Sequence, residues 1–356
     1  MHFETRVFNG QFSSTGDFYY CSCQSEIRVY DTSNIFDWRL TSEIPGFNIQ
    51  WTITDLDLSP CENYLLYTTI DSHITLVNIR EDLSNPYNFQ CEGHQLPLET
   101  GRDHIGYAIW SAKFSGSGNE VVAGTSNDSI VIYDLVSKTT SYEIPNAHKE
   151  DINSVCFANR DESQVVFTGS DDSLIKIWDK RDLQRKPQGV LLGHREGITH
   201  ISSKGDGIHL ISNSKDQTLK LWDIRTMCSS SEASRFQKEN RYQTHFDYRW
   251  EDYPLRNYKK RLAADESLMT FRGHEILFTL IRCYFSPLFT TGQRFIYTGS
   301  SSKKVLIYDS YTGKKVTSLK PLIPLQQCVI RDVSWHPYLP LIASTASSNT
   351  IHIYSR

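Results

Sequence analysis

The stretch AHKEDINSVCFANRDESQVVFTGSDDSLIKIWDKR, residues 147–181, is followed by a second copy of the same pattern, GHREGITHISSKGDGIHLISNSKDQTLKLWDIR, residues 193–225. The histidines near their starts, His148 and His194, lie 46 positions apart, and the tryptophans near their ends lie 44 apart. Two adjacent copies this similar indicate that the chain is built from repeats. The remaining sequence can therefore be searched for weaker copies of one unit.

A period of about 40–45 residues, with a GH-like start and a WD end, is the signature of a WD40 propeller blade. Seven residues occupy the position of the tryptophan in successive copies: Tyr30, Val77, Tyr133, Trp178, Trp222, Tyr308 and Tyr354. Short alternating apolar runs, separated by Gly, Asn, Asp or Ser, surround each of them and predict strands and turns. We therefore predict an all-β fold, a seven-bladed WD40 β-propeller of four-stranded blades, in a single domain over residues 1–356.

The spacing of the seven copies also predicts one long insertion. Trp222 and Tyr308 are 86 positions apart, about forty more than one period. The extra residues, about 226–266, show no sustained period-2 alternation, so we favour an extended or partly helical loop between blades 5 and 6 over a hidden eighth blade. Only residues 1–5 precede the first inner strand. The seventh blade is therefore expected either to lack its outer strand or to use these residues.

The two best repeats share a buried polar network that is typical of WD repeats. The residues expected in it are His148, Asp172, Trp178, His194, Asp216 and Trp222, with a Ser or Thr of the second strand. A His–Asp pair also resembles part of a hydrolase triad, but recurrence at the blade period favours a structural role. The sequence holds no GxSxG, HExxH, GxGxxG or GxxxxGK[ST] motif and no zinc-ligand spacing. We therefore predict no enzyme activity, cofactor or metal.

The residues after each tryptophan carry a separate signal. Arg181 and Arg225 stand two positions beyond Asp179 and Asp223, just past the predicted third strand of each blade. An arginine there should project from the rim of one propeller face. Its planar guanidinium could pair with its own aspartate or bind the carboxylates of a partner. The local pattern leaves both alternatives open.

Amino-acid composition and net charge limit the classes of partner and the cellular compartments that we expect. The net charge of −4 and the pI near 6.3 give no reason to expect general nucleic-acid affinity. No 18-residue apolar run predicts a membrane span, and the start of the chain has no secretory signal. Eight cysteines without a CxxC motif indicate reduced thiols. We expect the protein in the nucleus, the cytoplasm or both.

The WD-Lys-Arg and WD-Ile-Arg sequences in consecutive blades resemble the WDxR box of cullin-4 ubiquitin-ligase substrate receptors. GITHISSKGDG (197–207), FDYRW (246–250) and RDVSWHP (331–337) resemble one group of these receptors, the cullin-4-associated factor eleven type with its LEC14B-like relatives. The similarity extends over essentially the whole chain, including part of the insertion.

This resemblance implies a function. Asp179, Arg181, Asp223 and Arg225 would bind the ligase adaptor, the large subunit of the damaged-DNA-binding protein, and through it cullin-4. The chain would be the substrate-recognition subunit of a cullin-4 RING ligase, recruiting target proteins for ubiquitination and proteasomal degradation. Stress-response transcription factors are among the implied targets. The alternative is a general WD40 interaction scaffold in a nuclear complex.

The insertion is a second candidate for partner binding. It is rich in arginine and aromatic residues, and the candidates are Arg249, Trp250, Tyr253 and Arg256. Such enrichment is typical of protein-interface hot spots and of single-strand nucleic-acid binders. The alternative is that the aromatic rings anchor the loop on the propeller. Anchoring and protein binding remain open, and nucleic acid is the least favoured.

Overall fold

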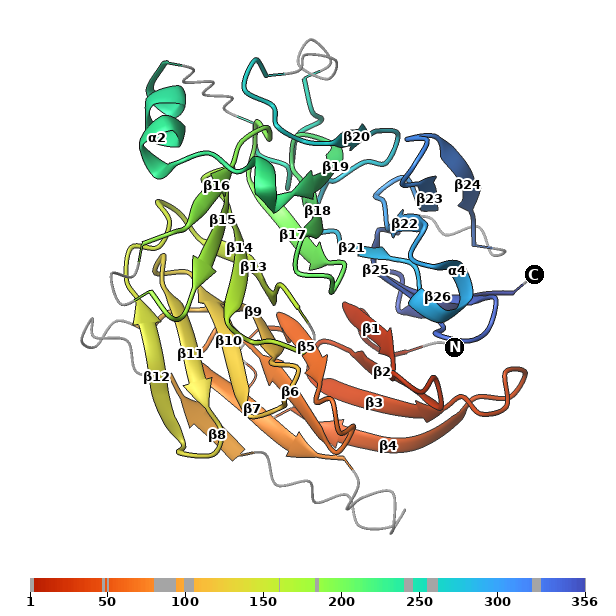
Figure 1. The fold of residues 1–356 in the computed structure, drawn as a ribbon. Coiled ribbons are helices and arrows are strands. Elements are labelled where there is room, and N and C mark those ends of the chain that lie inside the picture. The colour runs from red at the N-terminus through yellow and green to blue at the C-terminus, as the bar shows by residue number, and fades with distance from the viewer. Residues whose placement is uncertain are drawn as a thin grey trace.

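A computed structural model of the chain describes residues 3–46, 49, 51–79, 94–98, 106–159, 161–182, 186–239, 246–254, 262–321 and 328–355. Its strands form seven antiparallel sheets arranged around a common centre (Figure 1). The predicted seven-bladed β-propeller is therefore confirmed. The insertion is partly helical, as its lack of alternation predicts, and it follows the third strand of blade 5, so that the outer strand of that blade separates it from blade 6.

The first four blades each have four strands, numbered outward from the centre. Blade 1 has β1 (Asn9–Phe12), β2 (Phe18–Ser22), β3 (Glu26–Asp31) and β4 (Arg39–Pro45). Blade 2 has β5 (Asp55–Leu58), β6 (Tyr64–Thr68), β7 (His73–Asn78) and β8 (His94–Pro97). Blade 3 has β9 (Ile109–Phe114), β10 (Glu120–Thr125), β11 (Ile130–Asp134) and β12 (Thr139–Ile144). Blade 4 has β13 (Ile152–Phe157), β14 (Val165–Ser170), β15 (Ile175–Asp179) and β16 (Gly189–Leu191).

The last three blades include the helices. Blade 5 has β17 (Ile198–Ser203), β18 (His209–Ser214), β19 (Thr218–Asp223) and β20 (Met269–Phe271), with η1 (Ile224–Thr226) and α2 (Ser230–Glu239) between its last two strands. Blade 6 has β21 (Cys283–Phe285), α4 (Leu288–Thr291), β22 (Phe295–Thr298), β23 (Val305–Asp309) and β24 (Lys315–Leu319). Blade 7 has β25 (Ile330–Trp335), β26 (Leu341–Ala346) and β27 (Thr350–Ser355).

Apolar side chains between neighbouring sheets form the core. Between blades 4 and 5, Phe167 packs with Ile198 and Ile201, all almost fully buried. Gly169 on β14 permits this approach, because a Cβ built on it would lie 2.6 Å from Cγ2 of Ile198. Gly124 has the same relationship to Ile152 between blades 3 and 4, at 2.7 Å. A glycine on the second strand therefore sets the spacing of adjacent blades here.

The antiparallel sheets give the propeller two distinct faces. The first and third strands of a blade run in the same direction, so both end on one face, which we call the third-strand face. Asp179 and Asp223 end third strands and therefore lie on this face. The turn between the second and third strands lies on the opposite face. Lys215, in the turn between β18 and β19, marks that opposite face in blade 5.

Blade 7 differs from the others at its outer edge. Among the described residues its sheet has three strands. The described residues before β1 form no strand, and the backbone N of Phe3 donates to the carbonyl of Asn349, just before β27, at 2.8 Å. Its ring is buried beside Tyr30, and the guanidinium of Arg28 lies 4.9 Å from its centroid. The start of the described chain thus packs between blades 7 and 1.

Candidate functional site

The arginines predicted from the WD boxes sit in the same geometry in blades 4 and 5. Nε and Nη2 of Arg181 both donate to the Asp179 carboxylate, with Nε 2.9 Å from Oδ1. Arg225 donates to Asp223 in the same way, again with Nε 2.9 Å from Oδ1. The backbone N–H of each arginine donates to the same carboxylate, at 2.9 Å in both blades. Each aspartate therefore fixes both the turn and the side chain that follows it.

These two pairs lie on the third-strand face of consecutive blades and remain open to solvent. The side chains of Arg181 and Arg225 are both 69% exposed. Hydrogen bonds from these arginines lower the pKa of Asp179 and of Asp223, so both pairs stay ionised near neutral pH. Among the described residues, no hydrogen bond is made by Nη1 of either arginine. The local pairing and a role in partner binding are therefore compatible.

The predicted polar network is present in blade 4. Nδ1 of His148 lies 3.0 Å from Oδ2 of Asp172, and Nε2 lies 2.7 Å from Oγ1 of Thr168. Nε1 of Trp178 donates to the same Thr168 hydroxyl at 2.9 Å. Blade 5 repeats the arrangement with Ser212 in place of the threonine: the residues are His194, Asp216, Ser212 and Trp222.

This geometry fits a structural role better than catalysis. Burial lowers the pKa of both His148 and His194, although each faces an aspartate. The rings are almost completely buried, and both nitrogens of each are occupied by side-chain partners. A general base must reach a substrate proton, and these nitrogens have no access to solvent.

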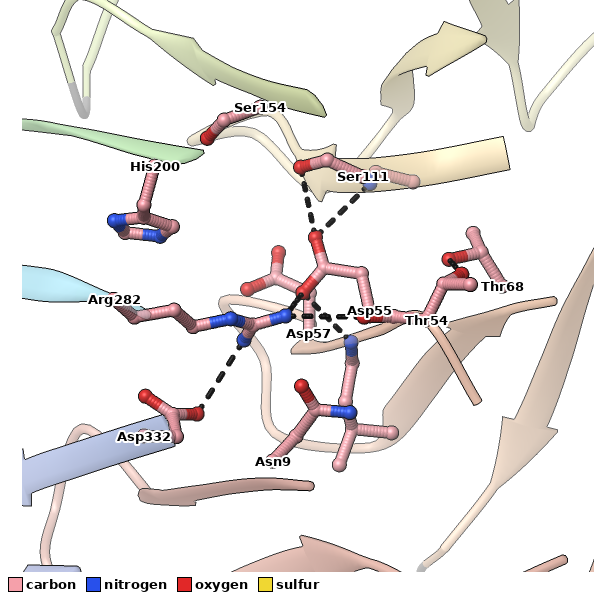
Figure 2. Close-up of polar contacts among 12 residues, drawn as sticks. Asn9, Thr54, Asp55, Asp57, Thr68, Ser111, Ser154, His200, Arg282 and Asp332 are labelled. Carbon is pink, nitrogen blue, oxygen red and sulfur yellow. Dashed lines mark hydrogen bonds and ion pairs between the residues drawn. The ribbon is translucent and has the colours of Figure 1, made fainter. Parts of the chain in front are cut away.

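A second polar cluster fills the centre of the propeller (Figure 2). The Arg282 side chain extends from the start of blade 6, and its Nη2 lies 2.7 Å from Oδ1 of Asp55 on β5. Its Nη1 lies 3.4 Å from Oδ2 of Asp332 on β25. Asp55 also accepts hydrogen bonds from Oγ of Ser111 at 2.8 Å and from the backbone N of Ala112 at 3.1 Å, both on β9. One arginine thus connects the inner strands of blades 2, 6 and 7, and Asp55 adds blade 3.

The charges in this cluster are matched. Burial alone would raise the pKa of Asp55, but Arg282 and Lys113 lower it overall. Burial raises the pKa of Asp57, whose nearest cation is Lys113, to about 6. Burial also lowers the pKa of Arg331 to about 10. The WD-box pattern does not mark these residues, although Asp55 and Asp332 hold equivalent positions on their inner strands: each accepts from a backbone N–H of the next blade, that of Ala112 or of Gly10. The cluster is a link between blades rather than a site for substrate.

The insertion begins by extending blade 4. After Arg225, Cys228 pairs with Val190 of β16 through two backbone hydrogen bonds of 2.9 Å. Helix α2 then lies beside β16 (Figure 1). Ala233 of this helix is buried against Leu174 and Val190. The first half of the insertion is therefore attached to the outer edge of blade 4.

The second half reaches the opposite face. The backbone N of Phe278 donates to the carbonyl of Tyr248 at 2.8 Å, and Nζ of Lys215 lies 4.4 Å from the Tyr248 ring centroid. Tyr253 is buried, with its ring edge-on to Phe246. The side chain of the candidate Tyr253 is thus buried and is not exposed to a partner.

The other candidates in the insertion differ from Tyr253 in their exposure to solvent or are not described. Trp250 is 83% exposed and can meet a partner. Arg249 is exposed and pairs with Asp247 through Nε and Nη2. Arg256 lies outside the described residues. In this segment the Tyr253 side chain is therefore buried, whereas the side chains of Trp250 and Arg249 are exposed.

A third arginine–aspartate pair, absent from the predicted set, lies on the third-strand face of blade 6. Asp309 ends β23, and Nε and Nη2 of Arg294 lie 2.9 and 2.6 Å from its Oδ2. Tyr311 stands where Arg181 and Arg225 stand in their blades, so the WD-box spacing does not reveal this pair. The pairing of Phe295 with Asp309 across β22 and β23 brings Arg294 to the carboxylate.

The described part of the chain contains no group of three or more His, Cys, Asp or Glu side chains placed to hold a metal ion. It also contains no helix long and apolar enough to cross a membrane.

The known proteins that resemble this chain, and the family model that matches it, agree with a WD-repeat protein. The WD domain, G-beta repeat model matches residues 139–179 and 185–223. A LEC14B protein of Lithospermum erythrorhizon is 40% identical over 352 residues, which is 98% of this chain and 72% of that protein. A LEC14B homolog of Prunus armeniaca is 41% identical over 97% of this chain and 71% of its own length. A Caenorhabditis elegans protein named DDB1- and CUL4-associated factor 11 homolog is 38% identical over 83% of this chain and 50% of its own length.

Proposed function

The chain belongs to the LEC14B family of WD40-repeat proteins, and we propose that it is a substrate-recognition subunit of a cullin-4 RING ubiquitin ligase. In this role it binds the ligase adaptor DDB1 and recruits target proteins for ubiquitination and proteasomal degradation. Relatives named for association with DDB1 and CUL4 support the proposal.

The observation that carries the proposal is the repeated arginine–aspartate pair on one face. Arg181 and Arg225 have the same hydrogen bonds and the same exposed fraction in consecutive blades. Each aspartate holds its arginine in one orientation, so little side-chain entropy is lost when the outward N–H groups bind. Two such groups on one rigid scaffold suit a partner that presents carboxylates or backbone carbonyls.

The rest of the molecule supports a binding role. The family model that matches is a WD repeat, and the buried histidines and carboxylates described above are occupied by contacts within the protein. The opposite face, with exposed Trp250, is available to recruited proteins. Location in the nucleus or cytoplasm belongs to this proposal, and the free thiols of the described cysteines support it because reducing compartments preserve thiols.

A direct binding measurement tests the proposal. Purified DDB1 is titrated onto the full chain and onto the Arg181→Ala/Arg225→Ala variant. We expect the variant to bind at least tenfold more weakly, since desolvated arginines are common hot spots. Arg249→Ala is the matched control, because Arg249 forms the same kind of pair with Asp247 in the insertion. Equal affinity of the double variant and the wild type would remove the argument from Arg181 and Arg225, and no binding of DDB1 by the wild type would leave a general scaffold.

A further inference from the structure

The aspartate that ends the third strand has one backbone setting in blades 4, 5 and 6. The residue after it donates its N–H to the carbonyl of the residue that precedes the second strand. These bonds are Lys180 to Gln164 at 2.9 Å, Ile224 to Ile208 at 3.0 Å, and Ser310 to Arg294 at 2.9 Å. Asp179, Asp223 and Asp309 are therefore equivalent positions.

In blade 6 the arginine of the pair comes from a different position in the blade. Arg294 comes from the position of Gln164 and Ile208, one strand away from the position of Arg181 and Arg225. Its guanidinium nevertheless binds the equivalent aspartate through the same two nitrogens, Nε and Nη2. Its side chain is 53% exposed, against 69% for the other two, and Asp309 is 7% exposed. The result is one arginine–aspartate pair on the third-strand face of each of three consecutive blades.

An exposed aromatic pair continues this face from blade 6 to blade 7. Phe289 on α4 and Tyr338, in the turn after β25, are 75% and 50% exposed. Their rings stack with centroids 5.6 Å apart and an interplanar angle of 24°. Both turns follow a first strand, so they lie on the third-strand face. Single exposed apolar residues are ordinary, but two stacked rings that solvent reaches, on the same face as the exposed Arg294 and in its own and the next blade, match the composition of interface hot spots.

We infer that Arg294 is a third docking arginine, and that the surface binding DDB1 extends from Arg181 and Arg225 across blade 6 to Phe289 and Tyr338. The inference rests on the proposed function, because the occupant is the same adaptor. One partner facing the third-strand face would meet all three pairs, since they occupy consecutive blades. Arg294 would bind its acidic or carbonyl groups, and the aromatic pair would cover an apolar patch on it.

The test measures the affinity of purified DDB1 for full-length variants. Arg294→Ala is expected to weaken binding about tenfold and Phe289→Ala about fivefold, as for interface residues of moderate to high importance. Arg294→Lys should restore little, because a lysine cannot hold Asp309 and bind a partner with a fixed fork. Arg249→Ala is the control and should bind DDB1 within twofold of the wild type, because the neighbouring Tyr248 lies against Phe278 and Lys215 on the opposite face, away from the surface proposed for DDB1. If the Arg294 variants misfold, Phe289→Ala still tests the surface, because the Phe289 side chain is exposed and its removal leaves no buried group unpaired.

The possible outcomes separate the two proposals. Weaker binding of Arg294→Ala and Phe289→Ala, with unchanged melting temperature for Phe289→Ala, supports the extended surface. Wild-type affinity of both variants, while Arg181→Ala/Arg225→Ala binds weakly, overturns the extended surface and leaves the proposed function standing. Absence of DDB1 binding by the wild type overturns both. If Phe289→Ala instead changes the oligomeric state of the chain alone and leaves the adaptor affinity intact, the patch binds a second copy and the inference is wrong.

Discussion

Arg282 and Asp55 form a buried ion pair across the centre of the propeller, with Nη2 of the arginine 2.7 Å from Oδ1 of the aspartate, although 227 positions separate them in the chain. Their side chains are 6% and 2% exposed. Since Arg282 begins blade 6 and Asp55 lies in blade 2, the pair spans two intervening blades. Asp332 of blade 7 also binds this arginine. Closure of the ring thus includes a polar contact at its centre as well as apolar packing between sheets.

Arg282→Ala should lower the free energy of unfolding by about 3–5 kcal/mol, because the substitution leaves the buried carboxylate of Asp55 without its main counter-ion. Urea denaturation monitored by tryptophan fluorescence measures the change. Arg249→Ala, which removes an exposed arginine, is the control and should unfold like the wild type. An Arg282→Ala protein as stable as the control would show that the central pair is dispensable.

Thr168→Val should destabilise blade 4 by about 1–3 kcal/mol. The valine keeps the shape of the side chain but leaves Nε2 of His148 and Nε1 of Trp178 without the hydroxyl that both contact. Thr168→Ser keeps the hydroxyl and should retain most of the stability, as blade 5 does with Ser212. Thermal unfolding of the two variants makes the comparison. Equal melting temperatures would mean that the hydroxyl contributes nothing.

The fold and part of the site follow from local sequence, for identifiable reasons. Each blade repeats the same strands and turns, so the position of Trp222 alone locates seven copies. Arg181 and Arg225 are predictable because each pairs with an aspartate two positions earlier. Arg294 is not, because its aspartate lies on the next strand and the pairing depends on the register of β22 and β23. The central Arg282–Asp55 pair is likewise not predictable from local sequence, since the two residues meet only after the ring has closed.

The insertion shows a further limit of local sequence. Its composition leaves anchoring and partner binding open, and the structure assigns buried Tyr253 to the first while exposed Trp250 stays available for the second. Both are aromatic residues within four positions. Burial in the folded protein separates them, and composition does not predict it.

Acidification should destabilise the protein through its buried histidines. Burial lowers the pKa of His274 to about 4, below the value of about 6.5 in the unfolded chain, so the unfolded state binds a proton that the folded state does not. The stabilisation is therefore complete above pH 6.5 and is lost as the pH falls toward 4. Between pH 7.5 and 5.5, His274 alone should account for a loss of about 1–2 kcal/mol. Asp57, with its raised pKa, acts in the opposite direction but equally in wild type and variant.

Urea denaturation at the two pH values, on the wild type and on His274→Gln, isolates this contribution. The glutamine variant is expected to lose less stability on acidification than the wild type, whatever its stability at pH 7.5. Parallel pH profiles for the two proteins would contradict the assignment.

Gly169→Ala should destabilise the packing of blade 4 on blade 5 by about 1–3 kcal/mol. The added methyl group would lie 2.6 Å from Cγ2 of Ile198 and 3.0 Å from Cγ2 of Ile201, so the inner strand of blade 5 must shift. Gly106→Ala is the matched control, because no atom of the described residues outside its own chain neighbours lies within 4 Å of a Cβ built on it. Differential scanning calorimetry should show a lower melting temperature for the first variant only. A similar melting temperature for both would mean that the space at Gly169 is not limiting.

Tyr253→Ala and Trp250→Ala should separate anchoring of the insertion from exposure on its surface. Removing the buried Tyr253 ring takes away buried apolar surface and its edge-on contact with Phe246, so this part of the insertion should open locally more often. Limited trypsin digestion detects this, because the insertion is rich in arginine and lysine, and cleavage within 226–266 should become several times faster. Trp250→Ala removes a side chain that is 83% exposed and should leave both the cleavage rate and the melting temperature unchanged. Equal cleavage rates for the two variants would show that Tyr253 does not hold the insertion in place.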